Sequence, residues 1–429
     1  MRNLFKIKII VCALAGLSAI ASAAENSPSA FIIEQVKKAI NHSPEIQRAG
    51  ADKEAAGWDI DQVKAQRWPQ VQLGGTSPLA GSGRKGSIRE NMNASNLSLS
   101  VNTTLYDWGK TSAQIAGAEY LEAASAYNVS SVNEQIAYST LTELMNLDRY
   151  QKQQTIAKSY VARMNELTRM LEAIIKVDPG RSNELTQARS KLLAAQSAQE
   201  NIDNALHLSK IKLLRLTGEE MVIPAGLTWG MPRYTAKQLR EGLRYHPVLL
   251  KARAETNAAR AQASAVEASR YPQINWSVSK IAQRDSSGHE GEWATGINLQ
   301  WKVFSGGAQK AAHQAARARA NGSEQQYHQA SLDMQHQIND LVQTRDSSRL
   351  QAKNYQALAA ESEKVSKIFF DQWLKLGKRT LLDVLTAEND HFNHQLTAVN
   401  QQYDGEIANV KLMASTAVLL RSLNLAQTK

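Results

Sequence analysis

The sequence carries the same succession of segments in each of its two halves. In both halves a helical stretch begins at a Pro and ends in an Arg-aromatic-Pro-Gln step. The stretch begins at Pro44 and ends at 67–70 in the first half, and it begins at Pro247 and ends at 270–273 in the second. Because both features recur after the same number of residues, we expect two copies of one structural unit, an internal two-fold repeat.

The correspondence continues along each half. Leu-Tyr-Asp-Trp-Gly at 105–109 matches Val-Phe-Ser-Gly-Gly at 303–307, and each opens an Ala-rich helical run. Within 221–232 regular helix is interrupted by Pro224, Gly226 and Pro232. We therefore predict a leader at 1–23, a first repeat at 24–222 and a second repeat at 223–429.

Each repeat is predicted to contain a helix, two strands around a Gly/Ser-rich loop, a long helix, a turn and another helix. The strand pairs are expected at about 68–107 and 271–304, and the helices at about 31–67, 111–176, 183–216 and 308–375. A helix as long as the second of these extends roughly 100 Å at about 1.5 Å per residue. This length predicts a mainly α protein in which the shorter helices stack end to end beside the long ones.

Alternation of apolar and polar residues marks the strands. It runs from Asn96 to Leu105 and recurs between Trp293 and Val303. Such a period of two predicts one apolar and one polar face. A soluble antiparallel sheet alternates in the same way, so alternation alone leaves open what covers the apolar face. We interpret 74–90 and 282–292 as loops that join the strands.

Aromatic residues flank both predicted strand pairs. They are Trp68, Tyr106, Trp108, Tyr271, Trp293 and Trp301. This placement is similar to the aromatic girdles of outer-membrane barrels and favours contact with outer-membrane lipid. The smallest single-chain membrane barrels need about eight strands. Four strands cannot close one, so several chains are expected to share a barrel.

The first 23 residues have the form of a secretory signal. Basic residues precede an apolar core, which is followed by small residues at 21–23. The one cysteine, Cys12, lies inside this segment and follows bulky Val11, a poor site for lipid attachment. We expect an exported, cysteine-free mature protein, with no later apolar run of the roughly 18 residues that a membrane-spanning helix needs.

No pattern indicates catalysis or cofactor binding. The sequence lacks a Gly-rich phosphate loop, a nucleophile elbow and a setting for paired catalytic carboxylates. His391 and His394, near Glu388 and Asp390, have a spacing that metal ligands can adopt, but we interpret them as a solvated polar helix face. Without the three basic residues of the signal, the formal net charge of +10 becomes +10 − 3 = +7, which we interpret as solvated surface and not as a nucleic-acid site.

The duplicated plan and one short motif resemble a known family. The motif is GKRTLLDVL at 377–385, which lies between the last two predicted helices. Together with the signal and the Trp68-Pro69 and Tyr271-Pro272 strand entries, it resembles the TolC-type outer-membrane channels over nearly the whole mature chain. This resemblance implies a homotrimer whose chains each give four strands to a shared twelve-stranded barrel and their helices to a tunnel across the periplasm. It also implies a periplasmic adaptor and an inner-membrane transporter of the ABC or RND type as partners.

Local chemistry explains part of this motif. Gly377 permits the positive backbone torsion that ends a long helix. Thr380 can cap the helix that follows, with Asp383 as the partner acid of a capping box. By resemblance, Glu184 of the first turn and Arg379 of the second form a charged clasp that closes the periplasmic mouth. Asp383, repeated by three-fold symmetry, forms a ring that favours cations.

The resemblance also assigns docking residues for the adaptor. They are Gly180, Arg181 and Ser182 in the first turn and Gly377, Arg379, Thr380 and Leu381 in the second. The sequence departs from the best-known pattern at Thr386, where a second acid is expected, and this weakens the predicted ring. The cargo, drug or secreted protein, stays open. The alternative is a periplasmic coiled-coil scaffold or an adaptor protein, which would lack lipid-facing strand pairs.

Overall fold

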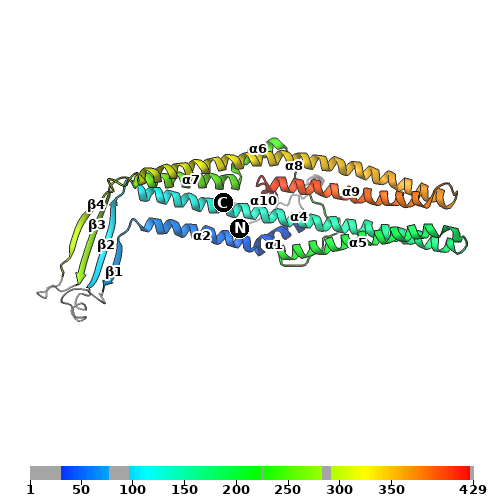
Figure 1. Ribbon diagram of the computed structural model, residues 1–429, viewed down its shortest axis with the longest axis horizontal. Helices are drawn as coiled ribbons and strands as arrows, with labels where there is room; N and C mark the ends of the chain where they lie inside the picture. The colour runs from blue at the N-terminus through cyan, green and yellow to red at the C-terminus, as the bar shows by residue number, and fades with distance from the viewer. Residues whose placement is uncertain (1–29, 77–95, 225, 283–290, 426–429) are drawn as a thin grey trace, which may run out of the picture. The chain divides into compact units, whose positions relative to one another are not determined.

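The computed structural model describes residues 30–76, 96–224, 226–282 and 291–425. The predicted signal at 1–23 and most of the two predicted loops lie outside these residues. In order, the elements are α1 Ala30–His42, α2 Pro44–Ala65, β1 Gln70–Thr76, β2 Asn96–Tyr106, α4 Lys110–Ile175, the 3-10 turn η2 Pro179–Arg181, α5 Ser182–Thr217, α6 Ala236–Gly242, the 3-10 turn η3 Leu243–Tyr245, α7 Pro247–Ala268, β3 Gln273–Ala282, β4 Ala294–Gln300, α8 Ala308–Leu374, α9 Leu381–Ala414 and α10 Leu419–Ser422 (Figure 1).

The predicted order of elements occurs in both halves of the chain. The long helices α4 and α8 contain 66 and 67 residues and begin and end within one residue of the predicted positions. The predicted helix at 31–67 is wrong in one respect, because it is two helices that break between His42 and Pro44. Pro44 has no backbone N–H to donate and disfavours helical torsions in the residue before it.

Residue contacts divide the chain into two compact units. Unit 1 comprises the chain up to Ser43 together with Asn133–Gly242 and Gln335–Lys429, and unit 2 comprises Pro44–Val132 and Leu243–Met334. Each unit draws on both predicted repeats, so the compact units are not the repeats themselves. The helices in the described part of the chain include none that is both long and apolar enough to cross a membrane.

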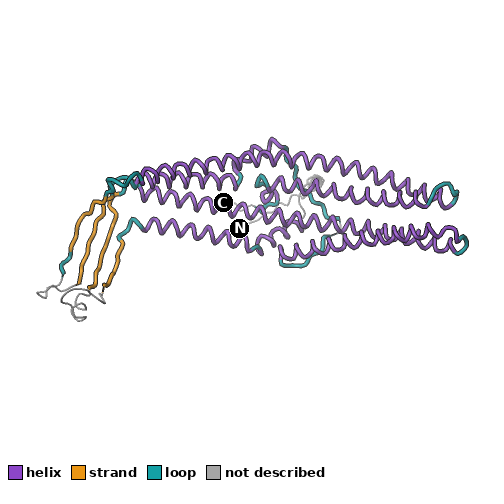
Figure 2. The backbone as a smooth tube through the Cα atoms, in the orientation of Figure 1, coloured by secondary structure: helices purple, strands orange, loops and turns teal. Residues whose placement is uncertain are grey.

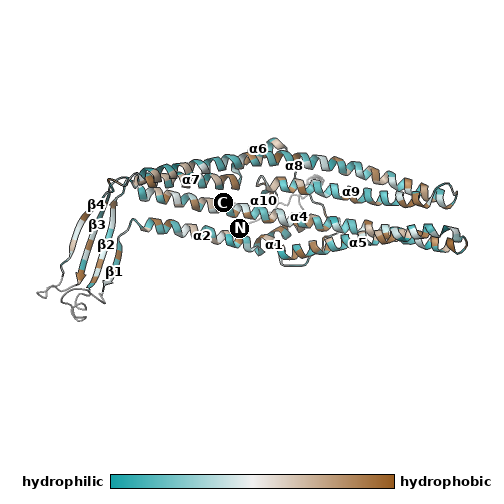
Figure 3. Cartoon of the chain, viewed as in Figure 1, coloured by the Kyte–Doolittle hydropathy of each residue, from teal (hydrophilic) through white to brown (hydrophobic). Residues whose placement is uncertain are grey.

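Unit 2 contains one antiparallel sheet in the order β1-β2-β3-β4 (Figure 2). Its register aligns the alternating residues of all four strands. One row joins Val71, Val101, Val278 and Thr295, and the next row joins Gln72, Ser100, Ser279 and Ala294. Because paired residues point to the same side, the sheet has one mainly apolar and one mainly polar face, as predicted. Figure 3 shows this alternation along the strands.

Strand β4 is shorter than predicted. It spans Ala294–Gln300, so Trp293 lies before the strand, and Trp301 and Val303 lie beyond it. The indole N–H of Trp301 donates to the carbonyl of Arg270 at 3.1 Å, and positive φ values follow at Gly306 and Gly307. These features turn the chain out of the strand and into α8.

Small residues bring the helices of unit 2 close together. A Cβ built on Gly117 of α4 would lie 3.7 Å from the Cβ of Ala261 in α7. Arg260 of α7 pairs with Glu324 of α8 at 2.7 Å, and the Thr256 hydroxyl donates to the carbonyl of Ser323 at 3.1 Å. The Ala-rich composition therefore serves close lateral packing.

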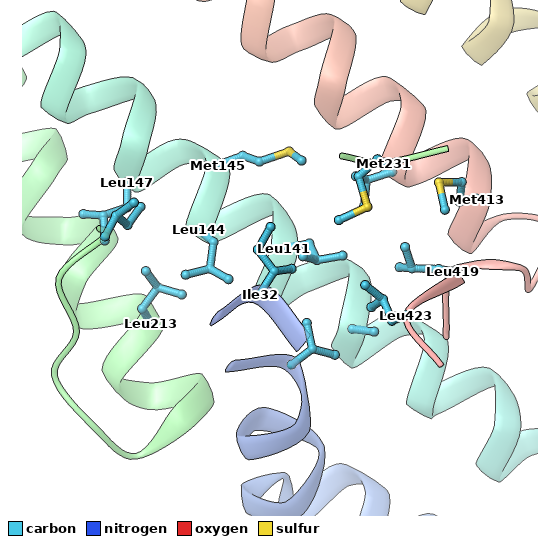
Figure 4. Close-up of a cluster of buried hydrophobic side chains, with 14 of the residues drawn as sticks. Ile32, Leu141, Leu144, Met145, Leu147, Leu213, Met231, Met413, Leu419 and Leu423 are labelled. Atoms are coloured by element: carbon cyan, nitrogen blue, oxygen red, sulfur yellow. The ribbon is translucent and has the colours of Figure 1, made fainter. Parts of the chain in front are cut away.

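Unit 1 has two apolar cores. In the first, α1 and the segment around α10 pack against α4, α5 and α9 (Figure 4). Its fully buried members include Ile32, Leu141, Leu144, Leu213, Met413, Leu419 and Leu423. The second core joins the ends of α4, α5, α8 and α9 near the two helical turns. Its members include Tyr160, Leu167, Leu171, Trp373, Leu381, Val384 and Phe392.

Glu134 is an acid buried beside the first core. It is 8% exposed, and its two carboxylate oxygens each lie 3.4 Å from the backbone N–H of Leu420, at the start of α10. Burial raises the pKa of Glu134 to about 8, against the backbone N–H groups and Arg421, which favour the charged form. Burial therefore favours the neutral form of Glu134 at pH 7.

A Glu134→Gln variant is expected to be more stable than the parent at pH 8. Stability held by the neutral acid is fully present below about pH 4 and is lost as the pH rises through about 8. Removing the titration should raise the unfolding free energy by about 3 kcal/mol at pH 7, by more at alkaline pH, and by almost nothing at pH 4. Thermal unfolding across this pH range measures the difference. The exposed Glu200→Gln is the control, and a gain that is the same at every pH would contradict the assignment.

Candidate functional site at the helical turns and the apolar sheet face

The turn between α8 and α9 is built as the sequence predicts. Helix α8 ends at Leu374, and Gly377 follows with a φ of +60°. A Cβ at Gly377 would have no atom within 4 Å, so glycine is needed there for its backbone torsion and not for space. Gly377 therefore directs the chain from one helix into the next.

The capping box at the start of α9 is confirmed. The backbone N–H of Asp383 donates to the Thr380 hydroxyl at 3.2 Å, and the backbone N–H of Thr380 donates to the Asp383 carboxylate at 3.0 Å. The pKa of Asp383 is lowered, first by the Thr380 backbone N–H and then by its hydroxyl. Asp383 is therefore ionised at neutral pH, as the proposed charged ring requires.

The turn between α4 and α5 has the same length as the turn between α8 and α9 and is held by its own side chains. Asp178 accepts a hydrogen bond from the backbone N–H of Gly180 at 3.2 Å, and Pro179 opens the 3-10 turn η2. Arg181 then binds the Glu184 carboxylate through two nitrogens, at 2.6 and 3.2 Å. This bidentate pair fixes the first turn of α5.

The two residues of the predicted clasp have other partners within the single chain. Glu184 is held by Arg181, whereas the Nε of Arg379 donates to Gln372 at 3.2 Å. The Arg379 guanidinium lies 4.2 Å from the ring centre of Phe369, a cation–π distance. A Glu184–Arg379 pair therefore stays a prediction for the periplasmic opening of an assembled oligomer.

Different residues join the two helical hairpins. Arg163 of α4 donates to Glu388 of α9 at 2.8 Å and lies 4.2 Å from the ring centre of Phe370 in α8. The Arg181 guanidinium lies 5.4 Å from the ring centre of Trp373. The sequence alone does not predict these contacts, although Glu388 interrupts the apolar face of α9 and so is a signal for a buried partner.

The predicted docking residues differ in accessibility. Thr380, Arg379 and Gly377 are exposed at the α8–α9 turn, as is Gly180 in the first turn, while Arg181 is half-buried. Leu381 is 1% exposed and belongs to the second core, so it cannot offer a contact surface. The exposed leucines at this turn are Leu376 and Leu382.

The apolar face of the sheet is exposed in the single chain. Ile297 is 70% exposed, and the other large apolar residues of this face that are exposed are Val71, Leu73, Leu97, Leu105, Trp276 and Leu299. Both edge strands, β1 and β4, have a neighbour on one side only. A wide apolar face with two open edges is a surface that soluble monomers avoid.

The six predicted aromatic residues are all exposed, but they do not form two equal groups. Five of them adjoin the ends of the strands that lead to or from the helices: Trp68, Tyr106, Trp108, Tyr271 and Trp301. Tyr106 and Tyr271 lie 5.0 and 5.3 Å from Trp108 between ring centres, and the Trp108 indole donates to the carbonyl of Pro272 at 2.8 Å. Trp293 lies at the opposite end of β4, where Lys280 approaches its ring at 5.6 Å.

The histidine interpretation is corrected in part. His391 is half-buried, with Nδ1 3.0 Å from the carbonyl of Ala359 and 3.3 Å from the hydroxyl of Ser362, both in α8. His394 is half-buried too, with its ring centre 6.3 Å from that of Tyr355 in α8, so the two histidines pack against a neighbouring helix and do not form a solvated face. Among the described residues, no group of three or more His, Cys, Asp or Glu could hold a metal ion.

Long paired helices together with an amphipathic sheet that has two open edges are typical of membrane-channel proteins that assemble from several chains. A family model described as outer membrane efflux protein matches residues 36–219 and 239–418. The outer membrane efflux protein BepC of Brucella suis is 23% identical over 335 residues, which cover 74% of this chain and 71% of BepC. The outer membrane protein TolC of Escherichia coli is 21% identical over 458 residues, which cover 100% of this chain and 90% of TolC.

Solved structures show the same fold. The outer membrane protein VceC of Vibrio cholerae matches with a TM-score of 0.76 at 21% identity, covering 92% of this chain and 98% of VceC. The outer membrane channel CmeC of Campylobacter jejuni matches with a TM-score of 0.78 at 15% identity, covering 97% and 94%. The chain belongs to the outer membrane efflux protein family. It is thus an efflux channel protein of the outer membrane of a Gram-negative cell.

Proposed function

We propose that this chain is one third of an exit duct that conducts substrates passively across the periplasm and the outer membrane. The observation that supports this most directly is the exposed apolar sheet face with two open edges. Lipid would cover the face, and strands of further copies would pair with the edges. Neighbouring strands in the sheet are antiparallel, so β4 of one copy and β1 of the next can continue the same alternation.

The number of copies follows from closure. A sheet of four strands is too narrow for a barrel, and membrane barrels need about eight or more. We propose three copies and twelve strands, as in the channels that the sequence resembles. The aromatic cluster at the helix-proximal strand ends would then lie at the periplasmic surface of the outer membrane, and Trp293 would lie at its outer surface.

The proposed duct supplies no energy of its own. An inner-membrane transporter of the ABC or RND type and a periplasmic adaptor would drive transport, with the adaptor docking at the turns around Gly180 and Thr380. The cargo is a drug or a secreted protein, selected by these partners. The rival proposal, a periplasmic coiled-coil scaffold or adaptor, leaves the apolar sheet face uncovered.

The first experiment is to extract the protein with detergent, determine its mass, and record its conductance in a planar bilayer. The proposed duct predicts a heat-stable trimer that conducts in small, mostly closed steps. A monomer or dimer that leaves the cell envelope without detergent would instead support the scaffold.

An Arg379→Ser variant is expected to conduct more than the parent. If Arg379 contributes to a clasp in each of three copies, its loss removes exposed ion pairs worth about 0 to 1 kcal/mol each. The mean conductance should rise roughly fivefold if one such pair limits opening. Lys378→Ser removes the same charge from the neighbouring exposed position and is the control. Equal conductance in parent and Arg379→Ser would count against the clasp.

A further inference from the structure

A groove of about 460 Å³ lies between α8 and α9, close to the turn that joins them. We name it the α8–α9 groove. Its apolar walls are formed by Leu358, Val365 and Phe369 of α8 and by Leu382 of α9. Leu358, Val365 and Leu382 are exposed in the single chain, at 46%, 40% and 56%. An apolar ligand that covered them would be stabilised by removing this surface from water.

Three carboxylates also line the α8–α9 groove, and no Lys or Arg does. Two of the three are engaged: Asp383 in the capping box and Glu361 with Lys364 at 2.8 Å. Asp390 is exposed, and no ion pair or hydrogen bond of its side chain occurs in the part of the chain that the structure describes. Asp390 is therefore the carboxylate best able to bind a cation.

Helix register places Asp390 near the middle of the groove. On α9, Asp383, Asp390 and His394 recur at intervals that keep them on one face, as Leu358, Glu361 and Val365 do on α8. The contacts of His391 with Ala359 and Ser362 align the two antiparallel helices. Asp390 thus lies at the level of Glu361, with apolar side chains on both sides along the groove.

His394 also lines the α8–α9 groove. The Nδ1 of His394 is buried and has no hydrogen-bond partner among the described residues. Other protein atoms cover this nitrogen, so a ligand in the groove would not reach it, and the proposal rests on the apolar walls and on Asp390. A bare metal ion does not fit, because the described residues contain no group of three or more metal-ligating side chains.

We propose that the α8–α9 groove binds a lipophilic organic cation. The apolar body of the ligand contacts Leu358, Val365 and Leu382, and its positive charge lies against Asp390, with Glu361 on the opposite wall. The inference depends on the exit duct for its biological meaning, because a groove beside Asp383 would then be met by cargo near the entrance. Asp390, one turn beyond Thr386, would supply the acid that Thr386 lacks.

The test uses the purified full-length protein in lipid nanodiscs and the cationic dye rhodamine 6G, with binding followed by fluorescence anisotropy. We expect saturable binding above the background of empty nanodiscs, and none of the anionic dye fluorescein. Asp390→Asn should weaken rhodamine 6G binding about fivefold, since it removes one partly exposed ion pair. Leu382→Ser should weaken it as well, at low and high salt alike. Glu200→Gln, an equal charge change on α5, should leave the dissociation constant unchanged.

Two outcomes would overturn the proposal. One is the absence of saturable rhodamine 6G binding, which is also expected if a second copy of the chain fills the groove. The other is an unchanged dissociation constant in Asp390→Asn. Conductance of the same preparations tests the duct separately. If the protein conducts but does not bind the dye, only the proposal for the groove is overturned. If it binds the dye but never conducts, only the proposal for the duct is overturned.

Discussion

Replacing Ile297 by Arg is expected to remove most of the protein from the outer-membrane fraction. Ile297 lies at the middle of β4 on the apolar face and is 70% exposed in the single chain. If lipid covers this face, a charged side chain near the middle of the membrane costs about 2–4 kcal/mol, and the cost recurs in every copy. Immunoblots of separated membrane fractions, with a heat-modifiability gel for assembled protein, measure the loss.

The neighbouring residue provides a matched control. Asn298 lies on the polar face, where its side-chain amide donates to the hydroxyl of Ser277 at 2.6 Å. Asn298→Arg introduces the same charge one position along the same strand, so it should assemble normally and alter only conductance. Equal amounts of assembled Ile297→Arg and Asn298→Arg would mean that lipid does not cover the Ile297 face.

Loss of the Arg163 side chain is expected to cost unit 1 several kcal/mol of stability. Glu388 has a side chain that is only 8% exposed, and Arg163 is its ion-pair partner at 2.8 Å. Arg163→Ala leaves a buried carboxylate without its counter-charge, a change that costs about 3–5 kcal/mol in well-buried pairs. The packing of the guanidinium on Phe370 is lost as well. Thermal unfolding of the purified protein should show a markedly lower midpoint.

A second substitution distinguishes charge from packing. In the double variant Arg163→Ala, Glu388→Leu no buried charge is left, so much of the stability should return. Arg169→Ala removes an exposed arginine from the same helix and should change the midpoint little. A double variant as unstable as Arg163→Ala would assign the loss to the Phe370 contact instead of the ion pair.

Local chemistry made the turn between α8 and α9 predictable. Gly377, Thr380 and Asp383 act within a few residues of one another, so their roles as torsion-permitting residue and capping box could be derived from spacing alone. The strands were predictable for a similar reason, because alternation fixes the faces whatever the partner strand is. The break at Pro44 was visible in the sequence, but the helical pattern on both sides of it favoured one continuous helix.

Contacts between distant segments could not be predicted in this way. The sequence pairs Glu184 with Arg379 by resemblance, whereas in the chain each binds a residue near it in sequence. The resemblance assigns Leu381 to the docking surface for the adaptor, yet its position at the start of α9 directs it into the second core. The Arg163–Glu388 pair joins helices separated by more than half of the chain, and no local pattern specifies such a partner.

The first core of unit 1 joins the beginning and the end of the described chain. Ile32 in α1 and Leu423 just beyond α10 belong to the same buried cluster. A newly exported polypeptide therefore cannot complete this core until its final segment has emerged from the export machinery. If lipid and further copies cover the sheet of unit 2, as proposed, its apolar face and its two edges stay uncovered during that interval. The order in which the segments emerge thus sets how long this apolar surface is exposed to water.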